Sequence, residues 1–227
     1  MTKNNQPPPS ATAKRILLVD DHPMLRQGIQ QYLQQEQDLV ICGQAGSAAE
    51  ALTMLAQLKP DLLIVDIGLP GRDGLELIKD IRALDAACAI LVFSMFDEEL
   101  YAERVLRAGA QGYLMKHESP LKLVQAIHRV LHGEMVTGPG VIQRALRRTA
   151  EGRDEKPASP ISLLTDRELE IFRLIGAGHP REDIARRLNL SVKTFEAHRA
   201  NIRQKLQLRS AAELLIHATQ FLHECNH

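Results

Sequence analysis

The segment LLIVDIGLP, residues 62–70, places a carboxylate in an apolar run. Five of its first six residues are apolar, and the fifth residue is Asp66. Burying an isolated carboxylate is costly, so a run of this kind excludes aspartate unless something holds or uses its charge. The segment therefore predicts a buried element in which Asp66 has a function.

Four similar apolar runs, separated by amphipathic segments, surround this one. Short runs rich in Leu, Ile and Val are typical of strands buried on both faces. The expected strands are residues 15–20, 39–45, 61–67, 89–95 and 112–116, and the expected helices are residues 23–36, 47–58, 74–84, 97–108 and 119–132. Five strands alternating with five helices predict an α/β domain with a doubly wound, five-stranded parallel sheet covered by helices on both faces.

The remaining segments predict a second domain. The chain has 227 residues, which suits two domains. A proline-rich arm, residues 1–13, is expected to be disordered, and the α/β domain occupies residues 14–133. Residues 134–160 carry turn residues and a polar, charged stretch, which indicates a linker. Residues 161–227 show helical patterns and no strand candidate, so we expect a small all-α domain there.

Composition narrows the class of protein. No apolar run approaches the roughly 20 residues of a membrane-spanning helix, so we expect a cytoplasmic protein without a membrane partner. The three cysteines are widely spaced and lack a CxxC pair, which argues against a disulfide or a zinc site. Residues 14–133 carry a net charge of −4, whereas residues 161–227 carry +2. The acidic part suits a cation and the mildly basic part suits a polyanion.

Polar residues end four of the expected strands. Asp20 and Asp21 end the first, Asp66 the third, Ser94 the fourth and Lys116 the fifth. Ligands of doubly wound sheets bind at the carboxyl ends of the strands, so these side chains should meet. Carboxylate ligands suit Mg²⁺, and a cation, a lysine and a hydroxyl around one carboxylate are what a phosphoryl acceptor needs.

Simpler interpretations exist for each residue alone. The turn at residues 20–23, Asp-Asp-His-Pro, is also a good helix start, and His22 fits a helix-start residue better than a metal ligand. Ser94 and Lys116 taken singly fit solvated or capping residues. Only their arrangement across four strand ends favours a functional site.

A family resemblance rests on these residues. The segments LLVDDHPMLRQGI, LLIVDIGLPGRDGLEL and ILVFSMFDEELYAERVLRAGAQGYLMK resemble the receiver domain of two-component response regulators. The resemblance implies that a sensor histidine kinase phosphorylates Asp66. It also implies Mg²⁺ bound by Asp21, Asp66 and the backbone carbonyl of Gly68, with Asp20 acting through a metal-bound water. The chain would be a phosphoacceptor regulator and not an enzyme, with only self-catalysed, Mg²⁺-dependent phosphotransfer and dephosphorylation.

The resemblance also implies a switch. Lys116 would bind the phosphoryl oxygens, Ser94 would move toward them, and Tyr113 would become buried in the space that Ser94 leaves. Without the resemblance, Tyr113 fits an ordinary aromatic at a strand end. In the family, the positions of Gly68 and Phe96 tune how fast water removes the phosphoryl group.

Three features predict a helix-turn-helix near the C-terminus. Residues 165–168, Thr-Asp-Arg-Glu, form a capping box before an apolar run, and a glycine-rich turn follows. A helix at about 181–188 and another at about 192–206, capped by Ser191, then fit a helix-turn-helix. A small helical protein-interaction module remains the alternative, because a net charge of +2 is weak evidence for nucleic acid.

Helical spacing assigns two faces to the last of these helices. Phe195, Ile202 and Leu206 share one stripe, and the opposite face is free to enter a groove. Small alanines allow the helix to approach the DNA closely and to contact thymine methyl groups. Gln204 can hydrogen-bond to adenine, and Glu196 can accept a hydrogen bond from cytosine. Basic residues suit phosphates. The residues expected to contact DNA are Lys193, Thr194, Glu196, Ala197, Arg199, Ala200, Arg203, Gln204 and Lys205.

The segment LTDRELEIFRLIGAGHPREDIARRLNLSVKTFEAHRANIRQKLQLRSAAEL resembles the LuxR-type DNA-binding domain. Together the two resemblances indicate a response regulator of the NarL/FixJ type. They imply a fourth helix at about 210–222 through which such domains dimerise, a homodimer when active, and double-stranded promoter DNA as a partner.

We therefore predict a DNA-binding transcriptional response regulator in which phosphorylation of Asp66 controls dimerisation and promoter binding. One alternative is a regulator that works without phosphorylation, which the complete set of acceptor residues argues against. Another is a phosphatase of the haloacid-dehalogenase type, which uses an aspartyl-phosphate. Such enzymes carry a second aspartate two residues after the nucleophile, where this chain has Gly68.

Overall fold

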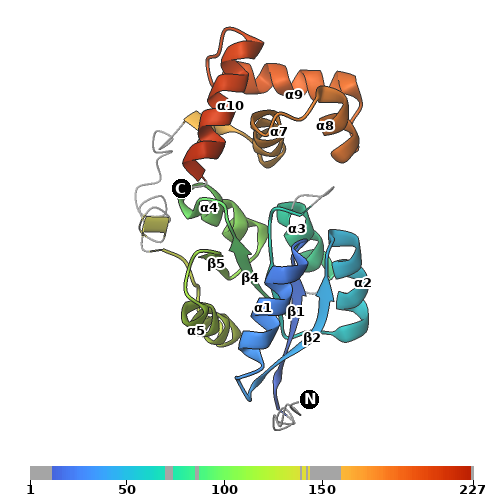
Figure 1. Ribbon diagram of the computed structural model, residues 1–227, viewed down its shortest axis with the longest axis vertical. Helices are drawn as coiled ribbons and strands as arrows, with labels where there is room; N and C mark the ends of the chain where they lie inside the picture. Colours follow the sequence, from blue (N-terminus) through green and yellow to red (C-terminus); the bar gives the residue numbers. More distant parts are fainter. Residues whose placement is uncertain are drawn as a thin grey trace.

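Five parallel strands form the sheet of the N-terminal domain, in the order β2-β1-β3-β4-β5 (Figure 1). The computed structural model describes residues 12–69, 74–84, 87–138, 140–141, 143 and 160–225. The strands are β1 (Lys14–Val19), β2 (Leu39–Ala45), β3 (Leu62–Val65), β4 (Ala89–Ser94) and β5 (Gly112–Met115). The predicted fold class is confirmed. Residues 1–11 of the expected arm and residues 144–159 of the expected linker lie outside the described residues.

Helices cover both faces of this sheet. They are α1 (Pro23–Leu33), α2 (Ala48–Leu58), α3 (Gly74–Leu84), α4 (Glu98–Ala108) and α5 (Pro120–Leu131). Alternate strand residues point to opposite faces, so Leu63 and Val65 pack with α2, α3 and α4, while Leu62 and Ile64 pack with α1 and α5. Both faces are therefore buried, as the continuous apolar runs predict.

The first helix ends earlier than expected, at Leu33 instead of residue 36. The amides of Gln35 and Glu36 donate to the carbonyls of Tyr32 and Leu33, three residues back instead of four. The chain thus tightens into a turn before β2 begins.

The C-terminal domain consists of four α-helices after a short 3-10 turn, η1 (Pro160–Leu163), which the sequence did not predict. The helices are α7 (Asp166–Gly176), α8 (Arg181–Arg187), α9 (Val192–Lys205) and α10 (Ala211–Cys225). The predicted capping box is present, with the Thr165 amide donating to Glu168 at 2.8 Å. Gly178 has a φ of 77°, a left-handed conformation that suits glycine in the turn after α7.

Helix α7 of the C-terminal domain contacts the N-terminal domain. Asp166 at its start lies 2.9 Å from Nζ of Lys79 in α3 and 3.0 Å from Nη1 of Arg104 in α4. Figure 1 shows α7 nearer the N-terminal domain than α9. The C-terminal domain therefore contacts the sheet domain through α7.

None of the described helices combines the length and apolar character needed to cross a lipid bilayer.

Candidate functional site

Asp66 lies directly beyond the end of β3, with only 5% of its surface exposed. Its amide donates to the carbonyl of Val19, which fixes the backbone beside β1. One carboxylate oxygen, Oδ1, accepts from the Ser94 hydroxyl at 2.8 Å and from the Gly68 amide at 3.0 Å. The other oxygen, Oδ2, lies 2.6 Å from Nζ of Lys116. The charge in the apolar segment is therefore held by three donors.

Lys116 bridges two buried carboxylates. Its Nζ lies 2.6 Å from Oδ2 of Asp20 as well as 2.6 Å from Oδ2 of Asp66. Burial alone would lower the pKa of Lys116, but the facing carboxylates of Asp66 and Asp20 outweigh burial and raise that pKa. Lys116 is thus charged at neutral pH and holds the two strand ends together.

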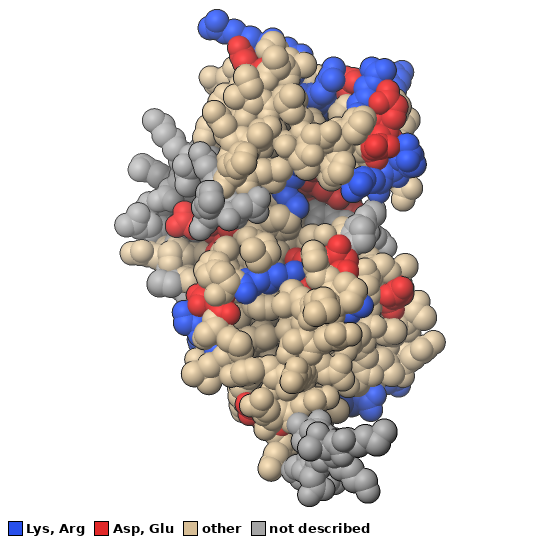
Figure 2. Space-filling view, viewed as in Figure 1, with Lys and Arg blue, Asp and Glu red and all other residues tan. Residues whose placement is uncertain are grey.

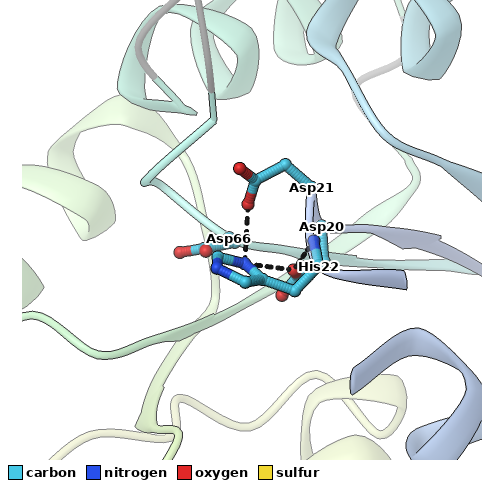
Figure 3. A group of neighbouring side chains, drawn as sticks. All are labelled: Asp20, Asp21, His22 and Asp66. Atoms are coloured by element: carbon cyan, nitrogen blue, oxygen red, sulfur yellow. Dashed lines mark hydrogen bonds and ion pairs between the residues drawn. The ribbon is translucent and has the colours of Figure 1, made fainter. Parts of the chain in front are cut away.

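Asp20, Asp21, His22 and Asp66 form a group whose potential ligand atoms lie within 4.8 Å of one another (Figure 3). His22 caps the start of α1, as expected, but without a side-chain hydrogen bond to that helix. Its Nδ1 lies 2.7 Å from Oδ1 of Asp21 and 3.2 Å from Oδ1 of Asp20. Three carboxylates this close need a cation, and their oxygens suit Mg²⁺. The side chains present therefore fit that ion.

The two expected switch residues are already turned inward. Ser94 has no exposed surface and bonds Asp66, and Tyr113 is 1% exposed. The Tyr113 hydroxyl donates to the carbonyl of Phe96 at 2.7 Å. Burial raises the pKa of Tyr113 well above its ordinary value. The structure therefore has the arrangement that we had expected only after phosphorylation, because the Asp66 carboxylate alone accepts the Ser94 hydrogen bond.

Helix α9 has the two faces that its sequence predicts. Phe195 and Ile202 are buried in the core of the C-terminal domain, and Leu206 packs against that core. Ser191 caps the helix by accepting from the Thr194 amide at 3.0 Å. The opposite face is exposed, and we call it the exposed α9 face; it comprises Lys193, Ala197, Ala200 and Gln204.

Several charged residues near this face are paired with one another. Arg199 lies 2.6 Å from Glu196, and Arg186 lies 2.7 Å from Asp183. Figure 2 shows the resulting mixture of basic and acidic side chains over this part of the C-terminal domain. Electrostatic attraction to a polyanion is therefore modest in this conformation.

Lys205, expected to contact phosphate, is bound within the domain. Its Nζ lies 2.6 Å from Oε2 of Glu168, the capping-box residue of α7. Burial would raise the pKa of Glu168, but Lys205 and the Thr165 amide outweigh burial and hold that pKa below its ordinary value. Lys205 thus fixes the end of α9 to the start of α7, and its contact with DNA stays a prediction.

Two family matches cover most of the chain. Residues 16–128 match the response regulator receiver domain, and residues 162–218 match the bacterial regulatory proteins of the luxR family. The nitrate/nitrite response regulator protein NarL of Escherichia coli (strain K12) is 35% identical over 207 residues, which cover 88% of this chain and 93% of that protein. This chain is a two-component response regulator with a LuxR-type DNA-binding domain.

Solved structures of RcsB, including one from Salmonella enterica serovar Typhimurium, are similar to this response regulator across both domains. One, bound to the promoter rprA with the phosphomimetic BeF3-, gives a TM-score of 0.68 at 25% identity and covers 91% of this chain and 98% of that one. Another structure, of two RcsB dimers bound to two parallel DNAs, gives a TM-score of 0.55 at 25% identity, covering 93% and 98%. These relatives are transcriptional regulators, as predicted for this chain.

Sequence reasoning missed one contact near the receiver site. The guanidinium of Arg173 in α7 lies 3.4 Å from the ring centre of Phe96, which follows Ser94 by two residues. The sequence pattern of α7 does not distinguish Arg173 from the other polar residues of this helix. The only sequence signal was its spacing of seven residues from Asp166, which places both on one face of α7.

Proposed function

We propose that Asp66 accepts a phosphoryl group from a sensor histidine kinase and that this modification controls dimerisation and promoter binding. The observation that supports this function best is the convergence of Lys116, Ser94 and the Gly68 amide on one buried carboxylate. A phosphoryl acceptor needs preorganised donors for several oxygens, and a lysine ammonium, a hydroxyl and a backbone amide supply them here.

The transfer is a displacement at phosphorus. A carboxylate oxygen of Asp66 forms a bond to phosphorus while the bond to the donor nitrogen breaks, and the nitrogen keeps the electron pair. Lys116 then donates to a phosphoryl oxygen instead of the Asp66 carboxylate, and Ser94 donates to another. Asp21, Asp66 and the Gly68 carbonyl would hold Mg²⁺, and Asp20 would act through a water bound to the ion. The ion would neutralise charge on the phosphoryl oxygens.

The added charge reaches the surface through Ser94 and Tyr113. A phosphoryl group adds roughly one negative charge and several strong acceptor oxygens at the end of β3. Ser94 must leave the carboxylate to bond those oxygens, and this movement alters the loop that carries Phe96. Tyr113 is already buried and donates to the carbonyl of Phe96, so the movement reaches Tyr113 through that hydrogen bond.

Promoter binding is assigned to the exposed α9 face. Ala197 and Ala200 allow close approach to base edges, Glu196 and Gln204 suit cytosine and adenine, and the basic residues suit phosphates. The contacts proposed at phosphates and helix start are Lys193, Thr194, Arg199, Arg203 and Lys205. The RcsB structure bound to promoter rprA supports this role by similarity.

Dimerisation is assigned to α10. Leu215 and Ile216 are 46% and 56% exposed on this helix, and adjacent exposed apolar side chains favour association. The structure of RcsB dimers on DNA supports a dimer by similarity. Two copies would then bind paired half-sites, as two-fold symmetric regulators do.

Intact-mass measurement after treatment with acetyl phosphate and Mg²⁺ tests this function. The unaltered chain should gain one phosphoryl group and sediment as a dimer, and Asp66→Asn should do neither. Equal phosphoryl uptake by Asp66→Asn, or an unchanged sedimentation coefficient on phosphorylation, would contradict the proposal.

A further inference from the structure

The Phe96 ring and the Asp66 carboxylate both lie beside Gly68, which has no side chain. A Cβ atom placed on Gly68 would lie 3.4 Å from Oδ2 of Asp66 and 3.5 Å from Cε2 and Cζ of Phe96. The ring edge and the carboxylate therefore border the same small space above Gly68. Two of the three atoms nearest to that position belong to the Phe96 ring.

The DNA-binding domain holds that ring in place. The guanidinium carbon of Arg173 lies 3.4 Å from the ring centre, and the Tyr101 ring stacks on Phe96 with centroids 5.2 Å apart. A cation over an aromatic face is attracted by the ring electrons. Nε of Arg173 is buried and has no hydrogen-bond partner in the described part of the chain. The ring is thus one partner of this side chain, which also acts electrostatically on Glu170.

Two ion pairs bring Arg173 to Phe96. Asp166 joins Lys79 and Arg104, and Arg104 also donates to the carbonyl of Ser162 at 3.3 Å. Arg173 follows Asp166 by seven residues on the same face of α7, so docking of the helix start places the guanidinium over the ring. Burial would raise the pKa of Asp166, but its two cationic partners outweigh burial and lower that pKa, so the pairs are complete at neutral pH.

We propose that Arg173 is a positioning residue for the phosphoryl chemistry of Asp66: by holding Phe96 over Gly68, the docked DNA-binding domain slows hydrolysis of the phosphoryl group. The inference rests on the proposed function and adds a regulation of the same site. It assigns control over the lifetime of the signal to a residue of the other domain.

The reaction explains why the ring matters. A water oxygen forms a bond to phosphorus opposite the bond between phosphorus and Asp66. That second bond breaks, the carboxylate keeps the electron pair, and the water protons pass to the phosphate and to solvent. In this proposal the attacking water reaches the phosphorus past the space that the Phe96 ring borders. A ring released by Arg173 rotates more freely and admits water more often.

The exposed α9 face stays uncovered in this docked arrangement. Lys193, Ala197, Ala200 and Gln204 are exposed while α7 contacts the receiver. The contact through Arg173 therefore acts on the phosphoryl group without hiding the surface assigned to DNA. A DNA-binding domain that leaves the receiver would shorten the signal.

Phosphoryl lifetime in the full-length chain tests the inference. The protein is phosphorylated with acetyl phosphate and Mg²⁺, the donor is removed, and the remaining phosphoprotein is followed on a phosphate-affinity gel. Arg173→Ala should lose the group about three- to tenfold faster, which lies within the range expected for the loss of a single cation–π contact. Arg173→Lys, which keeps the cation, should stay near the unaltered rate, and Arg173→Gln should behave like Arg173→Ala.

Two further variants make the test specific. Arg209→Ala removes an exposed arginine of the same domain and should leave the lifetime unchanged. Phe96→Ala should itself shorten the lifetime, and adding Arg173→Ala to it should have no further effect. Unchanged lifetimes in Arg173→Ala and Arg173→Gln, or full additivity with Phe96→Ala, would overturn the inference alone. If the unaltered chain takes up no phosphoryl group, the proposed function and this inference both fail.

Discussion

The acid site of the receiver and the exposed α9 face are built in opposite ways. The acid site comprises Asp20, Asp21, Asp66, Ser94 and Lys116, and its central groups are buried and bonded to one another before any phosphoryl group arrives. The α9 face carries short or flexible side chains that point to solvent. One region has its chemistry set by contacts inside the domain, whereas the other acquires its contacts from a partner.

The two regions therefore respond differently to substitution. A change in the acid site removes a bonded partner from a buried charge, so its effects are large and independent of any ligand. A change on the α9 face removes no internal contact, so its effects appear only with DNA and are small for each residue.

Lys116→Met gives the largest expected effect. The substitution keeps the length of the side chain but removes the ammonium group that neutralises Asp20 and Asp66. Phosphoryl uptake from acetyl phosphate should fall about a hundredfold, the loss typical of removing one preorganised charged donor. Uptake is measured by intact mass over time.

Lys122→Met is the matched control for that change. Lys122 is 57% exposed on α5 and pairs with Glu118. The Lys122→Met variant should take up the phosphoryl group at the same rate as the unaltered chain. Uptake by Lys116→Met at the same rate as this control would break the contrast between the two regions.

Glu168→Gln tests whether the α9 face depends on buried support. Glu168 is 3% exposed and bonds Lys205 and the Thr165 amide. Losing its charge should lower the free energy of unfolding of the C-terminal domain by about 2 kcal/mol at pH 7, as for hydrogen bonds to charged groups. Thermal unfolding measures this difference.

The pH dependence of that stability has a defined sign. Because the pKa of Glu168 is lowered, its charge-dependent contribution is complete above the ordinary value of 4.5 and is lost as pH falls through the lower folded value. The difference in the free energy of unfolding between Glu168→Gln and the unaltered chain should therefore become smaller as the pH falls. The exposed control Glu182→Gln should unfold like the unaltered chain, and a constant gap down to pH 3 would refute the assignment.

Lys193→Ala gives the smallest expected effect. If Lys193 contacts one phosphate, the slope of log affinity against log salt concentration should become shallower by about 0.9. Base preference should not change, because phosphate contacts carry no sequence information. Fluorescence anisotropy at several salt concentrations measures the slope, with Lys122→Ala as the control of equal charge. An unchanged slope would remove Lys193 from the interface.

The sequence predicted the elements and the acid site because both depend on local patterns. Apolar runs locate strands, and polar residues at their ends meet at one edge of a parallel sheet, so Asp66 and Lys116 could be paired in advance. The contact between Arg173 and Phe96 depends on how two separate domains dock. Helical periodicity separates polar from apolar faces, but it does not say which polar residues meet another domain.

Residue types also leave side-chain conformation open. The sequence predicts Ser94 as a donor, but it does not tell whether the hydroxyl bonds Asp66 before phosphorylation. Lys205 fits a phosphate contact by its position on α9, and only the tertiary packing of α7 against α9 brings it to Glu168.

DNA affinity measured with and without phosphorylation of Asp66 tests whether the receiver controls promoter binding. A promoter fragment recovered by genomic pull-down is titrated with the unaltered chain, with and without acetyl phosphate, and with Asp66→Asn under the same two conditions. We predict that the phosphodonor raises the affinity of the unaltered chain at least about tenfold, as for a coupling free energy of roughly 1.4 kcal/mol, and leaves Asp66→Asn unchanged. Equal affinities in all four samples would contradict control of promoter binding through Asp66.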